Sequence, residues 1–223
     1  MCLIVGVATL AAATGIAALG SGLGMSALPR ALAILDQRLP GIFRVHMVAS
    51  GLALILIPCM VLLRRYRSAH RYVGRVTVAL VLTGAIASLP SSLASEASPL
   101  ARLGFLTQGV LCLAFLLQAI RAIRMGKVER HAHLMLCIGA IMFGAVLLRI
   151  MMALAVRLQL PFEAAYAIIA WLSWTLPLTG VCLSSRRGLG HLRKSVPAPA
   201  SMPTMLINKL GLWLSHFRPE MGQ

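Results

Sequence analysis

Six long runs of apolar residues, joined by short polar loops, constrain this chain more than any other feature. A helix needs about 20 mostly apolar residues to cross the hydrocarbon core of a bilayer. Inside lipid, a helix forms all of its backbone hydrogen bonds within itself, whereas β-strands would have to close into a barrel. The sequence therefore predicts an all-α, polytopic transmembrane helix bundle within residues 1–184. Its spans are expected at about 2–24, 43–63, 73–92, 102–121, 133–156 and 163–184.

Composition supports a membrane domain over a water-soluble one. Hydrophobic residues make up 59% of the 223 positions, and charged residues only 12%. This chain has too few polar residues to cover the surface of a water-soluble fold of its size. In a bilayer, the outward-facing apolar side chains lie against lipid and need no polar cover. The net charge of +16 is split into short basic clusters between the apolar runs. This pattern is typical of membrane orientation and argues against nucleic-acid binding.

The arginines and lysines predict an orientation. One set of loops and the tail carry Arg64, Arg65, Arg67, Arg71, Arg75, Arg121, Arg124, Lys127, Arg130, Arg186, Arg187, Arg193 and Lys194. The opposite loops carry only Arg30, Arg38, Arg44, Arg102 and Arg157. Because basic loops stay in the cytoplasm, the richer set is expected inside. With six spans, both termini of this multi-pass plasma-membrane protein are then cytoplasmic.

The two ends of the chain are less regular than its middle. The first run could be a cleaved signal peptide, but it has no basic leader and is longer than a usual signal core. Its small residues Ala11 and Gly15 suit helix–helix contact, so a retained span is expected. Residues 185–223 are expected to form a basic cytoplasmic tail. Within it, 204–217 is too short to span and is either an interfacial amphipathic helix or a frayed end.

Arg149 is the clearest ionisable residue inside a predicted span. It lies about 10 Å from the outer end of the fifth span at the helical rise. Charged groups in a span are costly and are therefore candidates for function. Arg149 could anchor an anionic small molecule or lipid, or pair with Asp36, Glu96 or Glu163 on the same side. It could also extend to the outer headgroups without any ligand.

The histidines lie near the ends of the spans. His46 opens the second span on the outer side, and is a second candidate for ligand binding. His70, His131 and His133 lie on the inner side. Haem b needs two such side chains at one depth, so His70 with His131 or His133 could bind it. His131 and His133 point to nearly opposite sides of a helix, so at most one faces the interior. All four could instead be interfacial residues bonded to lipid, water or loop carbonyls.

No catalytic motif is present. The sequence contains no glycine-rich phosphate loop and no serine or cysteine nucleophile beside an evident base, so no enzyme activity is expected. No acidic residue lies deep in a span, which argues against an ion-coupled transporter. The five cysteines fall one per apolar run without the spacing of a metal or redox motif. They are expected to be small, buried, reduced side chains.

Two stretches resemble the bacterial membrane proteins grouped as domain of unknown function 2306. The first begins at His46 and continues to a His-Arg-x-x-Gly-Arg turn at residues 70–75. The second runs from His131 to Arg149. Together they cover roughly residues 43–156 and imply a bacterial inner-membrane helix bundle. The chain departs from the family at Met60, Thr77 and 134–137, where the family usually has Gln, Tyr and Trp-Met-x-Arg, so a shared ligand site would be altered.

Three functions are compatible with these features. The first is an accessory or structural membrane protein, acting as a homo-oligomer or beside a partner membrane protein. The second is a haem- or quinone-linked electron carrier that uses the inner histidines. The third is a transporter or receptor for an anionic molecule that uses Arg149. The missing deep acids and the altered family positions favour the first.

Overall fold

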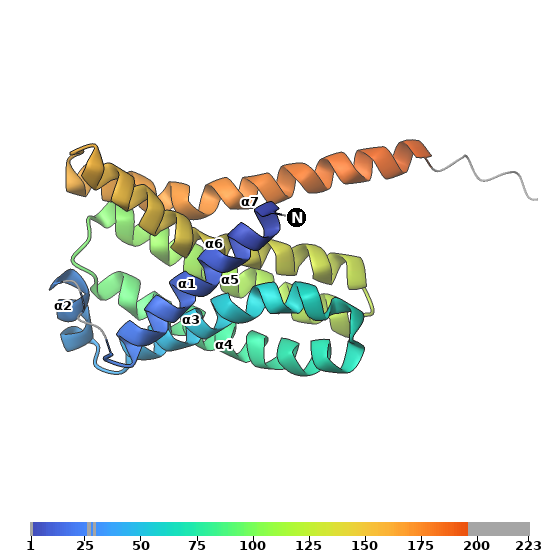
Figure 1. Ribbon diagram of the computed structural model, residues 1–223, viewed down its shortest axis with the longest axis horizontal. Coiled ribbons are helices and arrows are strands. Elements are labelled where there is room, and N and C mark those ends of the chain that lie inside the picture. The colour runs from blue at the N-terminus through green and yellow to red at the C-terminus, as the bar shows by residue number, and fades with distance from the viewer. Residues whose placement is uncertain (1, 26–27, 29, 196–223) are drawn as a thin grey trace, which may run out of the picture. The chain divides into compact units, whose positions relative to one another are not determined.

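The computed structural model describes residues 2–25, 28 and 30–195. That part of the chain forms seven α-helices and one short 3₁₀ helix (Figure 1). The elements are α1 (Cys2–Gly22), α2 (Arg30–Arg38), α3 (Ile42–Leu62), η1 (Leu63–Arg65), α4 (Arg67–Ala94), α5 (Pro99–Arg124), α6 (Val128–Arg157) and α7 (Phe162–Ser195). The chain divides into two compact units, Met1–Leu183 and Ser184–Gln223. The first unit contains the bundle; the predicted helix at 204–217 lies outside the described residues.

Five of these helices are long and apolar enough to cross a membrane, so the predicted all-α membrane bundle is confirmed. They correspond to the second to sixth predicted spans, and four of the five begin several residues earlier or end later than the apolar runs do. The helix α1 also forms, but its described apolar stretch, Gly6–Gly22, is shorter than the other five. Its role as a sixth span therefore stays a prediction.

The short helix α2 was not predicted from the sequence. It lies in the connection between α1 and α3, where Leu35 is buried and Leu32 packs beside it. These leucines pack with Phe43 and Met47 of α3 in one apolar cluster. The charged residues of α2 lie on its other faces, so α2 is a small amphipathic helix. It covers one end of the bundle.

The turns between helices follow local sequence signals. Ser98 precedes α5, and its hydroxyl oxygen accepts a hydrogen bond from the Ala101 backbone at 3.4 Å. Pro99 occupies the first turn, where its missing N–H costs nothing. The helix α5 ends at Arg124, and Gly126 in the turn that follows has a φ of 71°, a left-handed conformation that glycine adopts without strain. Short turns of this kind place successive helices antiparallel.

Glycines allow the helices to approach one another closely. A Cβ on Gly15 of α1 would lie 2.6 Å from the Gly51 carbonyl of α3, and one on Gly51 would lie 2.7 Å from the Gly15 carbonyl. Ala11 is buried in the same interface, so the small residues of the first run do make the predicted helix contact. Such contacts specify helix packing in lipid. Lipid is as apolar as the helix surfaces, so burying apolar side chains does not by itself favour one helix contact over another. Equivalent close approaches occur at Gly84, Gly104, Gly109 and Gly144.

Candidate functional site

The two ends of the first unit carry different candidate residues. The α2 end comprises α2, the start of α3 and the connections around residues 95–98 and 158–161. The basic end comprises the turns around residues 63–66 and 125–127. Figure 1 shows α3 and α4 joined at one side and α2 at the other. His46 lies towards the α2 end, whereas His70, His131 and His133 lie towards the basic end.

His46 connects α3 to α4. Its Nδ1 lies 2.9 Å from the Gly84 carbonyl oxygen, and the Ser50 hydroxyl lies 3.4 Å from the same nitrogen. A carbonyl only accepts, so Nδ1 donates, and the neutral imidazole carries its lone pair on Nε2. The absent side chain of Gly84 makes this approach feasible, because a Cβ there would lie 2.6 Å from the Ser50 oxygen. His46 therefore forms a hydrogen bond between α3 and α4 and has one defined tautomer.

His131 plays the same geometric role at the basic end. Its Nδ1 lies 3.0 Å from the Ala119 carbonyl oxygen of α5 and donates to it. His133 differs, because its Nε2 lies 3.7 Å from Cys137 Sγ on its own helix. The two side chains thus point to different surroundings, as their spacing predicts. His131 thus bonds a neighbouring helix, α5.

His70 lies near the start of α4 and is half-buried. Its Nδ1 is buried without a hydrogen-bond partner among the described residues. It shares the basic end with His131, whose ring bonds the Ala119 carbonyl of α5. The structure thus places His70 and His131 at one end of the bundle without joining them directly.

Arg149 lies on an exposed face of α6. Its Nη1 donates to the Ala145 carbonyl oxygen, one turn earlier in the same helix, at 2.9 Å. Two of the three acids expected on its side pair elsewhere. Arg38 Nη2 is 2.6 Å from Glu96, and Arg44 binds Asp36. Within the described residues the guanidinium of Arg149 thus bonds its own backbone, and an anionic ligand for it stays a prediction.

The Asp36–Arg44 pair fixes α2 to the start of α3. Arg44 Nη2 donates to one carboxylate oxygen at 2.8 Å, and Nε donates to both oxygens at 3.0 and 3.1 Å. These hydrogen bonds, with the attraction between the opposite charges, hold the pKa of Asp36 below its usual value. The acid is therefore ionised at neutral pH and serves as a fixed partner for the arginine.

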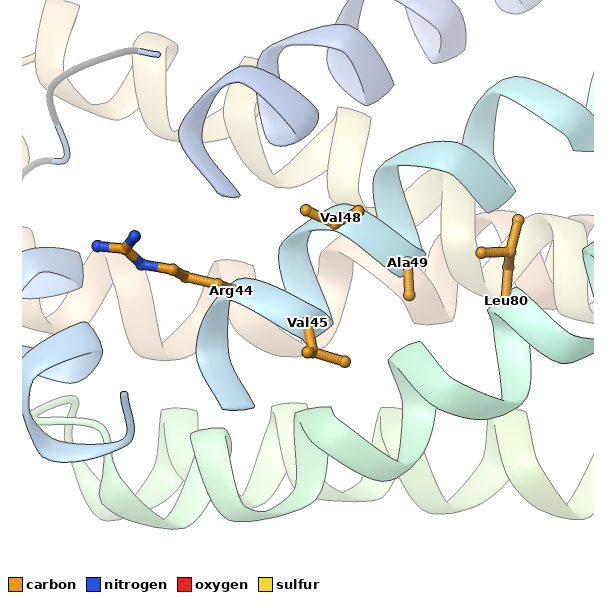
Figure 2. Close-up of a pocket in the computed structure, with 5 residues that line it drawn as sticks. All are labelled: Arg44, Val45, Val48, Ala49 and Leu80. Carbon is orange, nitrogen blue, oxygen red and sulfur yellow. The ribbon is translucent and has the colours of Figure 1, made fainter. Parts of the chain in front are cut away.

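A shallow apolar depression of about 250 Å³ lies beside this pair, on the surface of α3 and α4. It is lined by Arg44, Val45, Val48, Ala49 and Leu80. Figure 2 shows the charged end of Arg44 extending away from the four apolar side chains. Apart from Arg44, whose charged end points away, the lining is apolar.

Among the described residues, no three histidine, cysteine or acidic side chains converge into a group that could hold a metal ion. Polar side chains instead bond to backbone carbonyls across helix interfaces. Gln108 of α5 donates to Ile141 of α6 at 3.0 Å, and Trp171 of α7 donates to Leu100 of α5 at 3.0 Å. Gln108 and Trp171 thus each connect two helices.

Comparison with known families agrees with this architecture. The model of the predicted membrane protein family DUF2306 matches residues 43–181, from the start of α3 through most of α7. The chain belongs to this family. The resemblance noted from the residues reached only about position 156, so the DUF2306 match adds α7. No curated protein and no solved structure matches the chain.

The DUF2306 match excludes α1 and α2. The family positions that this chain alters fall near the basic end. Met60 packs against Gly74, since its methyl carbon would lie 3.1 Å from a Cβ there. Thr77 is buried, and its hydroxyl donates to the Val73 carbonyl of its own helix at 2.8 Å. Apolar packing and local bonding thus occupy the region next to His70.

Sequence reasoning missed one group of side chains, the thiols of Cys137 and Cys182. They are distant in sequence, on α6 and α7, but close enough for their side chains to interact. No local spacing could reveal this pair. The usable signal was the antiparallel alignment of the last two predicted spans, which places the start of one opposite the end of the other.

Proposed function

We propose that this DUF2306 protein is an accessory, structural membrane protein that acts by packing its helices within the bilayer beside a second copy or a partner protein. The observation that carries the proposal is the use of its polar side chains. His46, His131 and Gln108 each donate to a backbone carbonyl of a neighbouring helix. Such bonds, together with close-packed glycines, specify helix packing in lipid.

The proposed setting is the bacterial inner membrane with both termini in the cytoplasm. Arginine and lysine are concentrated at the basic end, which supports a cytoplasmic location for that end. The contact of α1 with α3 through Gly15 and Gly51 supports α1 as a retained sixth span. A second membrane protein or copy would then contact the exposed apolar faces.

The test is to extract the full chain from its native membrane into polymer nanodiscs and weigh the intact particles by native mass spectrometry. An accessory protein is expected in a particle of fixed composition that contains a second copy or one reproducible partner. Absorption spectra of the same particles are expected to show no haem band. Recovery of the chain as a monomer, with or without a bound group, would contradict the accessory role.

A haem-linked electron carrier is the second candidate, and one observation favours it. His131 donates through Nδ1 to a backbone carbonyl, which leaves Nε2 with the lone pair, as in most metal-binding histidines. His70 at the same end has a buried Nδ1 without a partner among the described residues. Two imidazoles are enough for haem b, which would supply one-electron chemistry when bound.

Haem supplementation during expression distinguishes the two candidates. The electron carrier predicts a Soret band that disappears in both His70→Phe and His131→Phe. His133→Phe is the matched control, because His133 bonds a thiol on its own helix. A flat spectrum in the folded, haem-supplemented wild type would reject the carrier. A band that all three variants retain would reject these ligands.

A further inference from the structure

The alignment of α6 and α7 can be followed through three contacts. Near the α2 end, Ala155 and Ala165 belong to one buried cluster. Further along, a Cβ on Gly144 would lie 2.9 Å from Trp174 Cβ, so the two helices nearly touch there. From that point α6 returns two turns to Cys137, and α7 advances about two turns to residue 182, at the helical rise of about 1.5 Å per residue. Antiparallel packing therefore brings the two cysteines to the same level.

The two thiols are close, chemically different and unbridged. Both are free in the structure, and Cys182 is close enough to Cys137 for the two side chains to interact. Cys137 is buried, with 3% of its surface exposed, whereas Cys182 is exposed. His133 Nε2 lies 3.7 Å from Cys137 Sγ and can take part in a proton exchange with it. An accessible thiol beside a buried one and an imidazole is the arrangement of many peroxide-sensitive pairs.

We propose that Cys137 and Cys182 are a redox modification site that a hydroperoxide converts to a disulfide linking α6 to α7. The Cys182 thiolate attacks the outer peroxide oxygen, the O–O bond breaks, and an alkoxide leaves and takes a proton. The resulting Cys182 sulfenic acid is attacked by Cys137 sulfur. An S–S bond forms, the S–O bond breaks, and water leaves with the Cys137 proton. Two thiols are oxidised by two electrons, and one hydroperoxide is reduced to an alcohol and water.

The division of roles follows from exposure. Cys182 meets the peroxide because it is exposed and lies one turn before Arg186, close to where the span ends. Cys137 resolves the sulfenic acid because it is buried beside it and shielded from direct attack. The product would join α7 to α6 near the basic end. This inference does not depend on the accessory role, since a thiol pair could serve any function of the bundle.

The experiment uses the full chain in membrane vesicles, in a background of Cys2→Ser, Cys59→Ser and Cys112→Ser. Vesicles receive hydrogen peroxide, and remaining thiols are labelled with maleimide and quantified at each cysteine by mass spectrometry. Cys137 and Cys182 are expected to lose labelling in equal proportion. The product is expected to run as a monomer on a non-reducing gel, and dithiothreitol is expected to restore both labels.

Single variants test the order of the steps. In Cys137→Ser, Cys182 is expected to stop at the sulfenic acid and be trapped by dimedone. In Cys182→Ser, Cys137 is expected to keep its label. The proposal is overturned if Cys182 loses labelling while Cys137 does not, or if Cys182 cross-links two chains. It is also overturned if both thiols stay reduced while glutathione added to the same vesicles is consumed.

Discussion

The two ends of the bundle use charged residues differently. At the α2 end, Arg38 pairs with Glu96 and Arg44 pairs with Asp36, and these are the ion pairs found in the described chain. The first pair connects α2 to the residues that follow α4, and the second connects α2 to α3. Arg38 also donates to the Ala94 carbonyl at 3.0 Å, which attaches α2 to the end of α4. Charges at this end therefore hold the connections in place.

At the basic end, the cations have no carboxylate partner within the described residues. Glu129 is the one acid in the two turns and their flanks, beside nine lysines and arginines: Arg64, Arg65, Arg67, Arg71, Arg75, Arg121, Arg124, Lys127 and Arg130. Exposed cations of this kind can meet anionic lipid headgroups and resist crossing the membrane. Charged residues thus stabilise local structure at the α2 end, whereas at the basic end they predict the orientation of the chain in the membrane.

Removing the cations of one basic turn should have the largest effect. Replacing Arg64, Arg65, Arg67, Arg71 and Arg75 together with Ser should give a mixture of two orientations, because the bias that retains this loop in the cytoplasm weakens. A reporter fused to the C-terminus, active on only one side of the membrane, measures the mixture.

The matched control neutralises the opposite end. Replacing Arg30, Arg38, Arg44, Arg102 and Arg157 with Ser removes as many charges but strengthens the same bias, so the reporter should stay on its original side. Equal inversion by both sets would show that the two ends do not differ in this respect.

A substitution that disrupts helix packing in the α2 half should have the next largest effect. Gly84→Leu places a side chain where Ser50 lies and where His46 reaches the Gly84 carbonyl. Overpacking of this kind should lower the free energy of unfolding by about 1–3 kcal/mol. The same substitution at Gly180, where a Cβ would meet nothing within 4 Å, should leave the stability unchanged. Unfolding in detergent with increasing denaturant gives both values, and similar losses at the two glycines would argue against close packing of α3 on α4.

The hydrogen bond of His131 at the basic end should contribute less to the free energy of unfolding. His131→Phe keeps an aromatic ring but removes the donor to Ala119, and should cost about 1 kcal/mol, the range of hydrogen bonds between membrane helices. His133→Phe is the comparison, because the contact of His133 with Cys137 lies within one helix, and its cost should be smaller. Thermal unfolding of both variants compares them directly. An equal loss of stability would assign the effect to ring size and not to the hydrogen bond.

Periodicity and apolar length predicted the helices well, because bilayer thickness sets a minimum length that the sequence displays directly. They did not predict α2, whose few apolar positions resemble an ordinary loop until Phe43 and Met47 pack against them. The helix ends also extend beyond the apolar runs, since polar residues such as those at 67–72 continue the helical turns of α4.

Individual candidate residues were found from the sequence, but their partners were not. His46 and His131 stand out because polar groups near spans are rare, yet only the fold shows that the carbonyls of Gly84 and Ala119 accept their hydrogen bonds. The Cys137–Cys182 pair depends on the alignment of two whole helices, which no short motif encodes. A ligand role for Arg149, His46, His70, His131 or His133 stays a prediction.

The smallest expected effect concerns the Asp36–Arg44 pair, which tests whether charge matters to stability at the α2 end. The pKa of Asp36 is lowered in the folded state by its hydrogen bonds to Arg44, so folding favours the ionised acid. This contribution is complete above the unfolded pKa of about 3.9 and is lost as the pH falls through the lower folded value. Because Arg44 is half-exposed, water and salt should screen the pair and keep the effect small.

Asp36→Asn should therefore reduce the melting temperature slightly at neutral pH. The difference should shrink as the pH falls below the unfolded pKa of about 3.9, and wild type and variant should converge below the lower folded pKa. High salt should also bring the two curves together, because it screens the exposed charges. Glu163→Asn is a suitable control, since no ion pair of Glu163 is found in the described chain. A difference between wild type and Asp36→Asn that persists unchanged at low pH would show that the side chain acts through packing, and the ion pair at the α2 end would then not account for the placement of α2.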